Sequence, residues 1–254
     1  MRVESTTTMS ANPSFAMNLA GPADQQEQPE SSVYEALLPL ARARILELGC
    51  GRADATRAIA ARHPEARITA MEVDEIQHQR NLANRDRPNV EYVEGGAQAI
   101  PVPDESFDVV LMLKSLHHVP TGELDDALAE IDRVLVPGGL AYLSEPVFAG
   151  AYNAIVRIFH DEERVRLAAF EAVRRAVASG RFELACERFF LAPVAFASFA
   201  DFERRVIGVT HTQHRLTPQQ LDATRTAFCK HLGPEGAAFR QPMRVDLLRK
   251  PASA

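Results

Sequence analysis

Residues 44–57 read RILELGCGRADATR, and the rest of the chain is organised around them. It opens with a short apolar run from Ile45, typical of a buried parallel strand, which the glycines Gly49 and Gly51 end. Asp54 then takes a position typical of a helix N-cap, ahead of an alanine-rich segment with helical spacing. The stretch therefore predicts a strand, a glycine turn and a helix.

A turn of this kind can bind a nucleotide-like ligand, because glycines let the backbone approach the ligand and the N–H groups of the next helix face it. A dinucleotide-binding loop carries a third glycine in the G-x-G-x-x-G register, which this chain lacks. The chain has instead the pattern Glu47-x-Gly49-x-Gly51-x-Ala53. A carboxylate at the end of the strand suits a sulfonium better than a pyrophosphate, which favours S-adenosyl-L-methionine over NAD.

A second acid lies where a ribose-binding residue is expected. The segment RITAMEV, residues 67–73, predicts a strand with Glu72 near its end. Glu72 follows Gly51 by a distance close to that at which an acid reaches a ribose diol in doubly wound folds. Its neighbour Val73 is included among the expected cofactor contacts. Asp74 is the second candidate for the ribose, with a helix cap as its alternative role.

The composition is that of a soluble globular protein. The chain has 254 residues, of which 46% are hydrophobic and 24% charged, and this predicts one domain with an appendage. No apolar run approaches the ~20 residues of a membrane span, so we expect a cytoplasmic protein without a membrane partner. The net charge of -6 argues against nucleic acid as a partner, because phosphate binding usually requires a basic face.

The segment ILELGCGRA, residues 45–53, resembles motif I of the class I S-adenosylmethionine-dependent methyltransferases, with Ala53 in place of the family's third glycine. Two further segments strengthen the resemblance. SLHHV, residues 115–119, resembles the LHHV signature of members that act on small molecules, and PGG, residues 137–139, turns a helix into the next strand. The resemblance implies an α/β, doubly wound, Rossmann-like sheet of seven mostly parallel strands, with a helical cap inserted after the fifth strand.

The resemblance also orders the chain into parts. Residues 1–29 are rich in polar residues and proline and predict a disordered tail, followed by a methyltransferase domain over 30–254. In that domain we expect a cofactor-binding core at 40–148, a substrate cap with the sixth strand at 149–240, and a closing strand at 241–250. A first helix, capped by Ser31 or Ser32, either covers the cofactor through Tyr34 or only packs on the sheet.

The loop after the third strand departs from the family. Members of the family usually carry an acid there that contacts the adenine, but this chain has Gly96 at that position. We expect the backbone N–H groups of Gly96 and Ala97, together with the Gln98 side chain, to contact the adenine instead.

Polar residues follow the fourth and fifth strands, where open α/β sheets bind their ligands. His117 and His118 are the best candidates for a general base, and Glu145 is the next; the alternative is that the histidines only pack at the strand end. Lys114 is expected to orient an anionic substrate or to bind the cofactor's methionine carboxylate. The sequence from Lys114 to His117 lacks the N-P-P-Y tetrad of enzymes that methylate DNA bases or glutamine side chains.

Other histidines raise the question of a metal. His160 and Glu162 lie close in sequence, and His211 and His214 have the spacing of one helical face, but no third ligand follows at a recognisable distance. We therefore expect no metal.

The sequence predicts a methyltransferase that moves a methyl group from S-adenosyl-L-methionine to an O, N or C atom of a small metabolite. The alternatives are a non-catalytic, cofactor-binding or regulatory protein on the same fold, and an NAD(P)-dependent oxidoreductase. The glycine register and the lack of a recognisable Tyr-x-x-x-Lys motif argue against the oxidoreductase.

Overall fold

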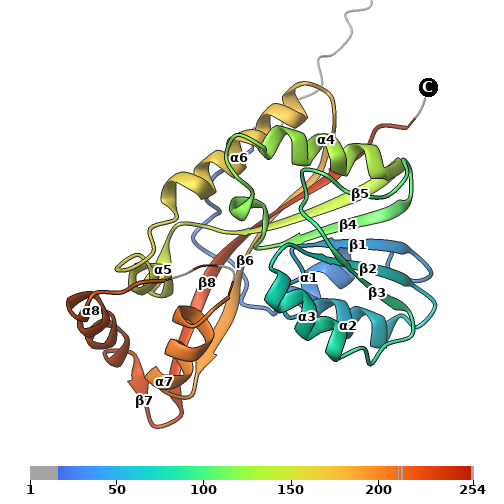
Figure 1. Cartoon of the computed structure of the whole chain (residues 1–254). Helices are drawn as coiled ribbons and strands as arrows, with labels where there is room; N and C mark the ends of the chain where they lie inside the picture. The colour runs from blue at the N-terminus through green and yellow to red at the C-terminus, as the bar shows by residue number, and fades with distance from the viewer. Residues whose placement is uncertain (1–16, 211, 213, 253–254) are drawn as a thin grey trace, which may run out of the picture.

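The computed structural model describes residues 17–210, 212 and 214–252. In this part of the chain the strands form one sheet in the order β3-β2-β1-β4-β5-β8-β6, with β7 added beside β8 (Figure 1). The first five strands pair in parallel, and β8 is antiparallel to β5, β6 and β7. The predicted doubly wound, mostly parallel sheet is confirmed, and the short β7 is an addition. The strands are β1 (Arg44–Leu48), β2 (Arg67–Glu72), β3 (Val90–Glu94), β4 (Phe107–Leu113), β5 (Leu135–Pro146), β6 (Glu183–Phe196), β7 (Leu232–Gly233) and β8 (Gly236–Arg249).

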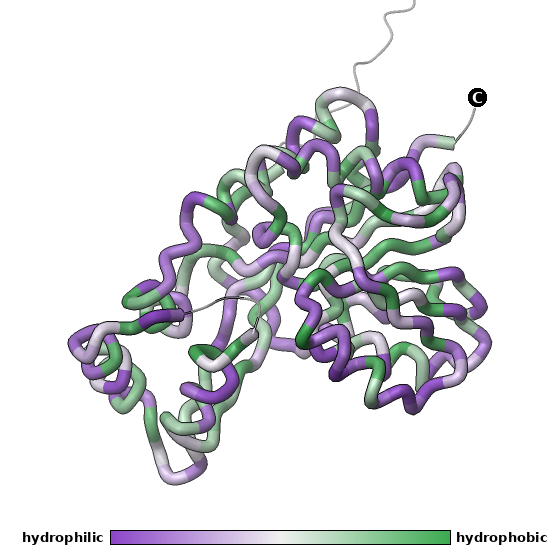
Figure 2. The backbone as a smooth tube through the Cα atoms, in the orientation of Figure 1, coloured by the Kyte–Doolittle hydropathy of each residue, from purple (hydrophilic) through white to green (hydrophobic). Residues whose placement is uncertain are grey.

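Side chains that alternate along the central strands build a core on each face of the sheet. On β1, Ile45 packs into one core, whereas Leu46 and Leu48 pack into the other. The helices α1 (Glu30–Leu37), α2 (Asp54–Arg62) and α3 (Glu75–Ala83) lie on the first face, and α4 (Leu124–Val134) and α6 (Glu163–Ala178) lie on the second (Figure 1). Figure 2 shows hydrophobic segments along the central strands and hydrophilic segments on the outer turns.

The chain before α1 lies along the outer edge of β6. The Leu191 N–H donates to the Gln26 carbonyl at 2.9 Å, and the Gln28 N–H donates to the Leu191 carbonyl at 3.1 Å. The prediction of a disordered tail therefore needs correction from residue 17 onward, because the edge strand supplies partners that the local sequence does not reveal. Residues 1–16 lie outside the described residues.

The first helix begins earlier than predicted. Pro29 is its N-cap residue and Glu30 its first residue, so neither Ser31 nor Ser32 caps it. Tyr34 is buried and packs edge-on against Tyr142 of the sheet, with the ring centroids 6.4 Å apart. Tyr34 therefore packs this helix on the sheet.

The segment predicted as a cap divides into two parts. Helix α6 packs beside α4 in the main core, where Ala172 and Val173 are buried. The rest forms a separate lobe, which comprises residues 150–160, 197–210, 212 and 214–236 and includes α5 (Gly150–Val156), α7 (Phe199–Phe202), the π-helix η2 (Glu203–Ile207), α8 (Pro218–Cys229) and β7.

The lobe has its own aromatic core at the far ends of β6 and β8, which run beyond the rest of the sheet (Figure 1). Phe196, Phe202, Phe228 and Phe239 contact one another there, and the rings of Phe202 and Phe228 have centroids 5.2 Å apart. Such ring contacts hold the lobe as a unit against the sheet.

The placement of α6 can be tested by comparing two of its residues. Val173 is 1% exposed in the main core, whereas Leu167 on the same helix is 45% exposed. We expect Val173→Ala to lower the free energy of unfolding by about 2 kcal/mol, through lost burial and a cavity. Thermal unfolding would then show a fall in Tm of roughly 4 to 8 °C. Leu167→Ala should leave Tm nearly unchanged, and equal effects of the two variants would contradict this placement of α6.

Candidate functional site

The turn between β1 and α2 leaves room for a ligand at one glycine and not at the other. Gly49 and Gly51 have φ values of +68° and +52°. A Cβ built at Gly49 would lie 2.7 Å from the Cβ of Ser115, whereas one at Gly51 would meet none of the described residues within 4 Å. Gly49 is thus required by close packing, and the space beside Gly51 is open to a ligand. Ala53 is also left-handed, with φ +56°, and is the N-cap residue of α2 in place of the expected Asp54.

Glu72 lies directly beside this turn. One carboxylate oxygen accepts the Gly51 N–H at 2.6 Å, and the other accepts the N–H groups of Val73 and Asp74 at 2.9 Å. Asp74 caps α3 by accepting the Ile76 N–H at 3.0 Å, so the helix-cap role considered for Asp74 is observed. Val73 and Ile76 are 66% and 57% exposed, which places two apolar side chains near Glu72 for a flat base to cover.

Glu47 is a buried carboxylate behind the turn. It is 3% exposed and accepts a hydrogen bond from the Thr56 hydroxyl. Burial raises the pKa of Glu47 to about 7, against the opposing effects of the Thr56 hydrogen bond and of the Lys114 ammonium. A cation bound near this group would favour its charged form.

The loop after β3 contacts the end of β2 through a hydrogen bond from the Gly95 N–H to the Glu72 carbonyl at 3.1 Å. The Gln98 side chain covers Gly96, since a Cβ built there would lie 2.5 Å from Oε1 of Gln98. The Ala97 side chain is buried in the main core, which leaves only its backbone for a ligand. Together with Glu47, Glu72 and the open side of Gly51, this loop forms a site whose groups fit an adenosyl group with a cationic end.

The segment after β4 connects this site to a cavity. Ser115 donates its hydroxyl hydrogen to the Leu48 carbonyl at 2.8 Å, next to Gly49. Lys114, just before it, is left-handed with φ +59° and pairs with Glu30 of α1 at 2.7 Å. The short 3₁₀ helix η1 (Leu116–His118) follows and carries both predicted histidines.

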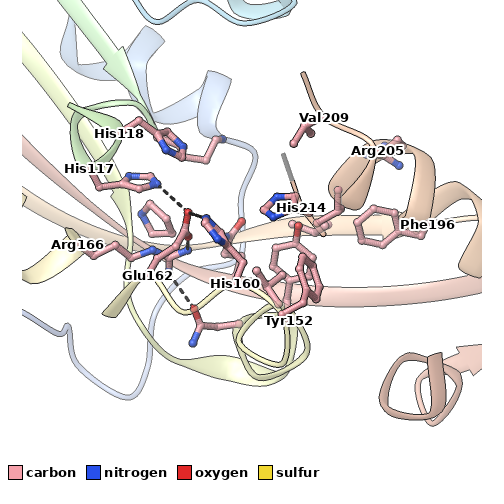
Figure 3. Close-up of a pocket in the computed structure, with 18 residues that line it drawn as sticks. His117, His118, Tyr152, His160, Glu162, Arg166, Phe196, Arg205, Val209 and His214 are labelled. Carbon is pink, nitrogen blue, oxygen red and sulfur yellow. Dashed lines mark hydrogen bonds and ion pairs between the residues drawn. The ribbon is translucent and has the colours of Figure 1, made fainter. Parts of the chain in front are cut away.

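The cavity has a volume of about 340 Å³ and lies between η1, the start of α6 and the lobe (Figure 3). Its wall combines aromatic, basic and histidine side chains from these elements. They include Lys114, His117, His118, Tyr152, Phe159, His160, Glu162, Arg166, Phe196, Arg205 and His214.

A buried ionic network forms one wall of this cavity. The His117 ring bonds to Glu145 through Nδ1, and Glu145 also accepts the Leu116 N–H at 2.9 Å. On the far side of the His117 ring lies Glu162, whose two oxygens contact His160 at 3.0 Å and Arg166 at 2.5 Å. Figure 3 shows His117, His160 and Arg166 around Glu162.

The network fixes the charge of His117. Burial lowers the pKa of His117, but the carboxylates of Glu145 and Glu162 outweigh burial and raise this pKa to about 9. Burial acts to raise the pKa of Glu145, yet His117 holds it below its usual range. In the absence of a bound ion, Glu145 and Glu162 thus favour the charged form of His117 at neutral pH. His118 is the exposed member of the pair, with its ring centroid 4.1 Å from that of His117.

In the sequence, His160 and Glu162 suggest a metal site that lacks a third ligand, and Arg166 carries no functional pattern. The available signal was the i, i+4 spacing of Glu162 and Arg166 across the start of a helix, which indicates a salt bridge but not its burial. His214 lies against His160, with ring centroids 4.6 Å apart, and His211 lies outside the described residues.

Comparisons with known proteins agree with the fold. Residues 45–139 match the family model for a methyltransferase domain. The ubiquinone/menaquinone biosynthesis C-methyltransferase UbiE of Methylobacterium nodulans is 30% identical over 184 residues, which cover 68% of this chain and 68% of that protein. A fatty-acid O-methyltransferase of Mycolicibacterium smegmatis is 35% identical over 101 residues, which cover 38% of this chain and 34% of that protein.

Among solved structures, a putative methyltransferase from Bacillus halodurans shares the fold, with a TM-score of 0.62 and 19% identity over 88% of this chain and 99% of that one. Within the described residues no helix is both long enough and apolar enough to cross a membrane. The likeness to UbiE extends over two thirds of each protein, well beyond the turn at Gly49 and Gly51. The chain therefore belongs to the S-adenosylmethionine-dependent methyltransferases, and its cofactor is S-adenosyl-L-methionine.

Proposed function

We propose that this methyltransferase transfers the methyl group to an O, N or C atom of a small metabolite held in the cavity beside η1. The observation that carries the proposal is the path of residues 114–118. Ser115 contacts the cofactor turn at Gly49, and three residues further on His118 lines the cavity. A donor bound on the turn and an acceptor in the cavity would thus be neighbours.

The proposed cofactor site is formed by residues at the ends of β1, β2 and β3 and in the loops that follow them. Glu72 would accept the ribose hydroxyls through Oε2, since this oxygen accepts only the Gly51 N–H and keeps a free lone pair. The open space beside Gly51 would hold S-adenosyl-L-methionine against the turn. The buried carboxylate of Glu47 would favour the positive charge of the sulfonium. The remaining proposed contacts are Gly49, Ala53, Val73, Gly96, Ala97, Gln98 and Lys114.

Bound S-adenosyl-L-methionine supplies an electrophilic methyl group, so the protein has mainly to align the acceptor and to exclude water. His118, exposed at the cavity, is the proposed general base for an acceptor that arrives protonated. His117 is charged at neutral pH and is better suited to orient an electron-rich acceptor atom. Glu145 acts through His117 and is a positioning residue.

The size and walls of the cavity favour a small molecule over a polymer. A volume of about 340 Å³ suits a metabolite. Tyr152 and Phe196 give it apolar surface, and the Arg205 guanidinium lies 4.7 Å from the centre of the Phe196 ring. One relative named above is a C-methyltransferase and another an O-methyltransferase, which is why the proposal keeps the acceptor atom open.

The cofactor site can be tested through Glu72. At a ligand concentration ~100 times Kd, binding stabilises the fold by ~2.7 kcal/mol, so S-adenosylhomocysteine should raise Tm by roughly 5 to 10 °C. We expect Glu72→Gln to lose most of this shift, because it weakens acceptance of the ribose hydroxyls. Glu75→Gln, three residues away on the exposed side of α3, should keep it. A full shift in Glu72→Gln would refute the assignment.

Glu47 predicts a pH dependence of stability in the absence of ligand. The folded-state pKa of about 7 lies above the ordinary value of ~4.3, so the folded protein binds an extra proton between these limits. Stability therefore falls as pH rises from 5 to 8, by up to about 3 kcal/mol from this group. Glu47→Gln lacks this titration, so its Tm relative to the wild type should increase from pH 5 to pH 8. A difference in Tm that stays constant with pH would contradict the burial argument.

The acceptor cavity can be tested by filling it. Val209 lines the cavity, and we expect Val209→Trp to lower kcat/KM by about tenfold or more without changing the affinity for S-adenosylhomocysteine. The assay measures S-adenosylhomocysteine formation with a panel of small hydroxyl, amine and activated-carbon acceptors. Leu232→Trp, on the outer hairpin of the same lobe where Leu232 is 44% exposed, is the matched control. Full activity in Val209→Trp, or no activity of the wild type on any acceptor class, would count against the proposal.

A further inference from the structure

Two groups that accept hydrogen bonds face each other in the cavity wall. Glu145 contacts Nδ1 of His117, which assigns the proton of the neutral ring to Nδ1. The lone pair of Nε2 then points toward Oε1 of Glu162, and the two atoms are 3.6 Å apart. In this neutral form the two facing acceptors leave a place for a cation between them, and in the charged form a proton on Nε2 takes that place.

The separation fits a metal ion better than a proton. A distance of 3.6 Å is too long for a hydrogen bond between nitrogen and oxygen. Two ligands of one tetrahedral zinc ion, with bonds of about 2.0 to 2.1 Å, lie about 3.4 Å apart. The observed spacing therefore needs only a small adjustment to hold an ion.

Further atoms that can bind a metal lie near Nε2 of His117 and Oε1 of Glu162. Ligand atoms of His117, His118 and Glu162 all lie within 4.8 Å of one another. His160 approaches the same Glu162 oxygen through Nε2 at 3.0 Å. These donors come from η1 and from the segment just before α6, so the fold and not the local sequence brings them together.

Neighbouring side chains orient Glu162 and His117 for metal binding. Arg166 holds the other oxygen of Glu162, Oε2, at 2.5 Å, which leaves Oε1 directed at His117. Arg166 is itself fixed by Asn153 at 2.9 Å. A carboxylate behind a histidine ligand, as Glu145 is behind His117, sets the ring orientation and increases its basicity.

We propose that His117, His118 and Glu162 bind a divalent transition-metal ion of the zinc type in the cavity wall. Two imidazoles and one carboxylate suit Zn²⁺, whereas Mg²⁺ prefers a set of oxygen ligands. A three-residue site leaves a coordination position open on the cavity side, where an oxygen of a small molecule would bind. The inference goes beyond the proposed function, and it limits His118 to one role at a time: with the ion bound, His118 is a ligand and not the general base.

The test is calorimetric titration of the untagged full chain, after treatment with a chelator, with Zn²⁺ and in parallel with Mg²⁺. We expect one Zn²⁺ per chain and no comparable binding of Mg²⁺. His118→Asn and Glu162→Gln should each weaken Zn²⁺ binding by about tenfold or more, because each removes a direct ligand. His63→Asn removes a histidine that pairs with a different glutamate, Glu35 at 2.9 Å, and should bind Zn²⁺ as the wild type does.

The alternative is a metal-free ionic network, in which a proton on His117 and the Arg166 guanidinium balance Glu162. Absence of Zn²⁺ binding to the wild type, or equal binding by all variants, would establish that alternative and overturn the proposal. Glu162 is buried, and its replacement can disturb folding. If it does, Zn²⁺ binding by His118→Asn, at an exposed position, distinguishes the metal site from the metal-free network. The Tm shift with S-adenosylhomocysteine is recorded for each variant, which separates failure of the metal site from failure of the proposed function.

Discussion

The contact between Ser115 and the turn at Gly49 is the constraint on which the site depends. The Ser115 hydroxyl bonds to the Leu48 carbonyl, and its Cβ occupies the space that a side chain at position 49 would need. This contact fixes the segment after β4 against the cofactor turn, because any larger residue at 49 would separate them. The position of η1, and with it of His117 and His118, follows from this contact.

Buried charge organises the site on both sides of that contact. Behind the cofactor turn burial raises the pKa of Glu47, against the opposing effects of its Thr56 hydrogen bond and of the Lys114 ammonium, and a bound sulfonium would offset the cost of ionising this carboxyl. In the cavity wall Glu145 and Glu162 flank His117, and their charges outweigh its burial. The Glu47 arrangement favours a cationic ligand. The His117 network places hydrogen-bond donors at the edge of the cavity, where the methyl acceptor would bind.

Much of the fold was predictable because its signals are local. The alternation around Ile45 and Leu46, the glycine turn and the spacing to Glu72 depend on residues near one another in sequence. The ordered conformation of residues 17–29 was not predictable, because this segment forms hydrogen bonds with Leu191 on a strand that is distant in sequence. The wall of the cavity was not predictable for the same reason, because Glu162 contacts His117, which lies on a different element. The contact of α6 with α4 in the main core likewise does not follow from the sequence pattern of α6.

A crystal structure of the chain with S-adenosylhomocysteine tests most directly whether cofactor and acceptor share one site. We expect the ribose hydroxyls to lie on Glu72 and the sulfur atom to point past Ser115 into the cavity, on the side of His118. A ligand bound elsewhere, or a sulfur atom that points away from the cavity, would contradict the claim that residues 114–118 join donor and acceptor in one site.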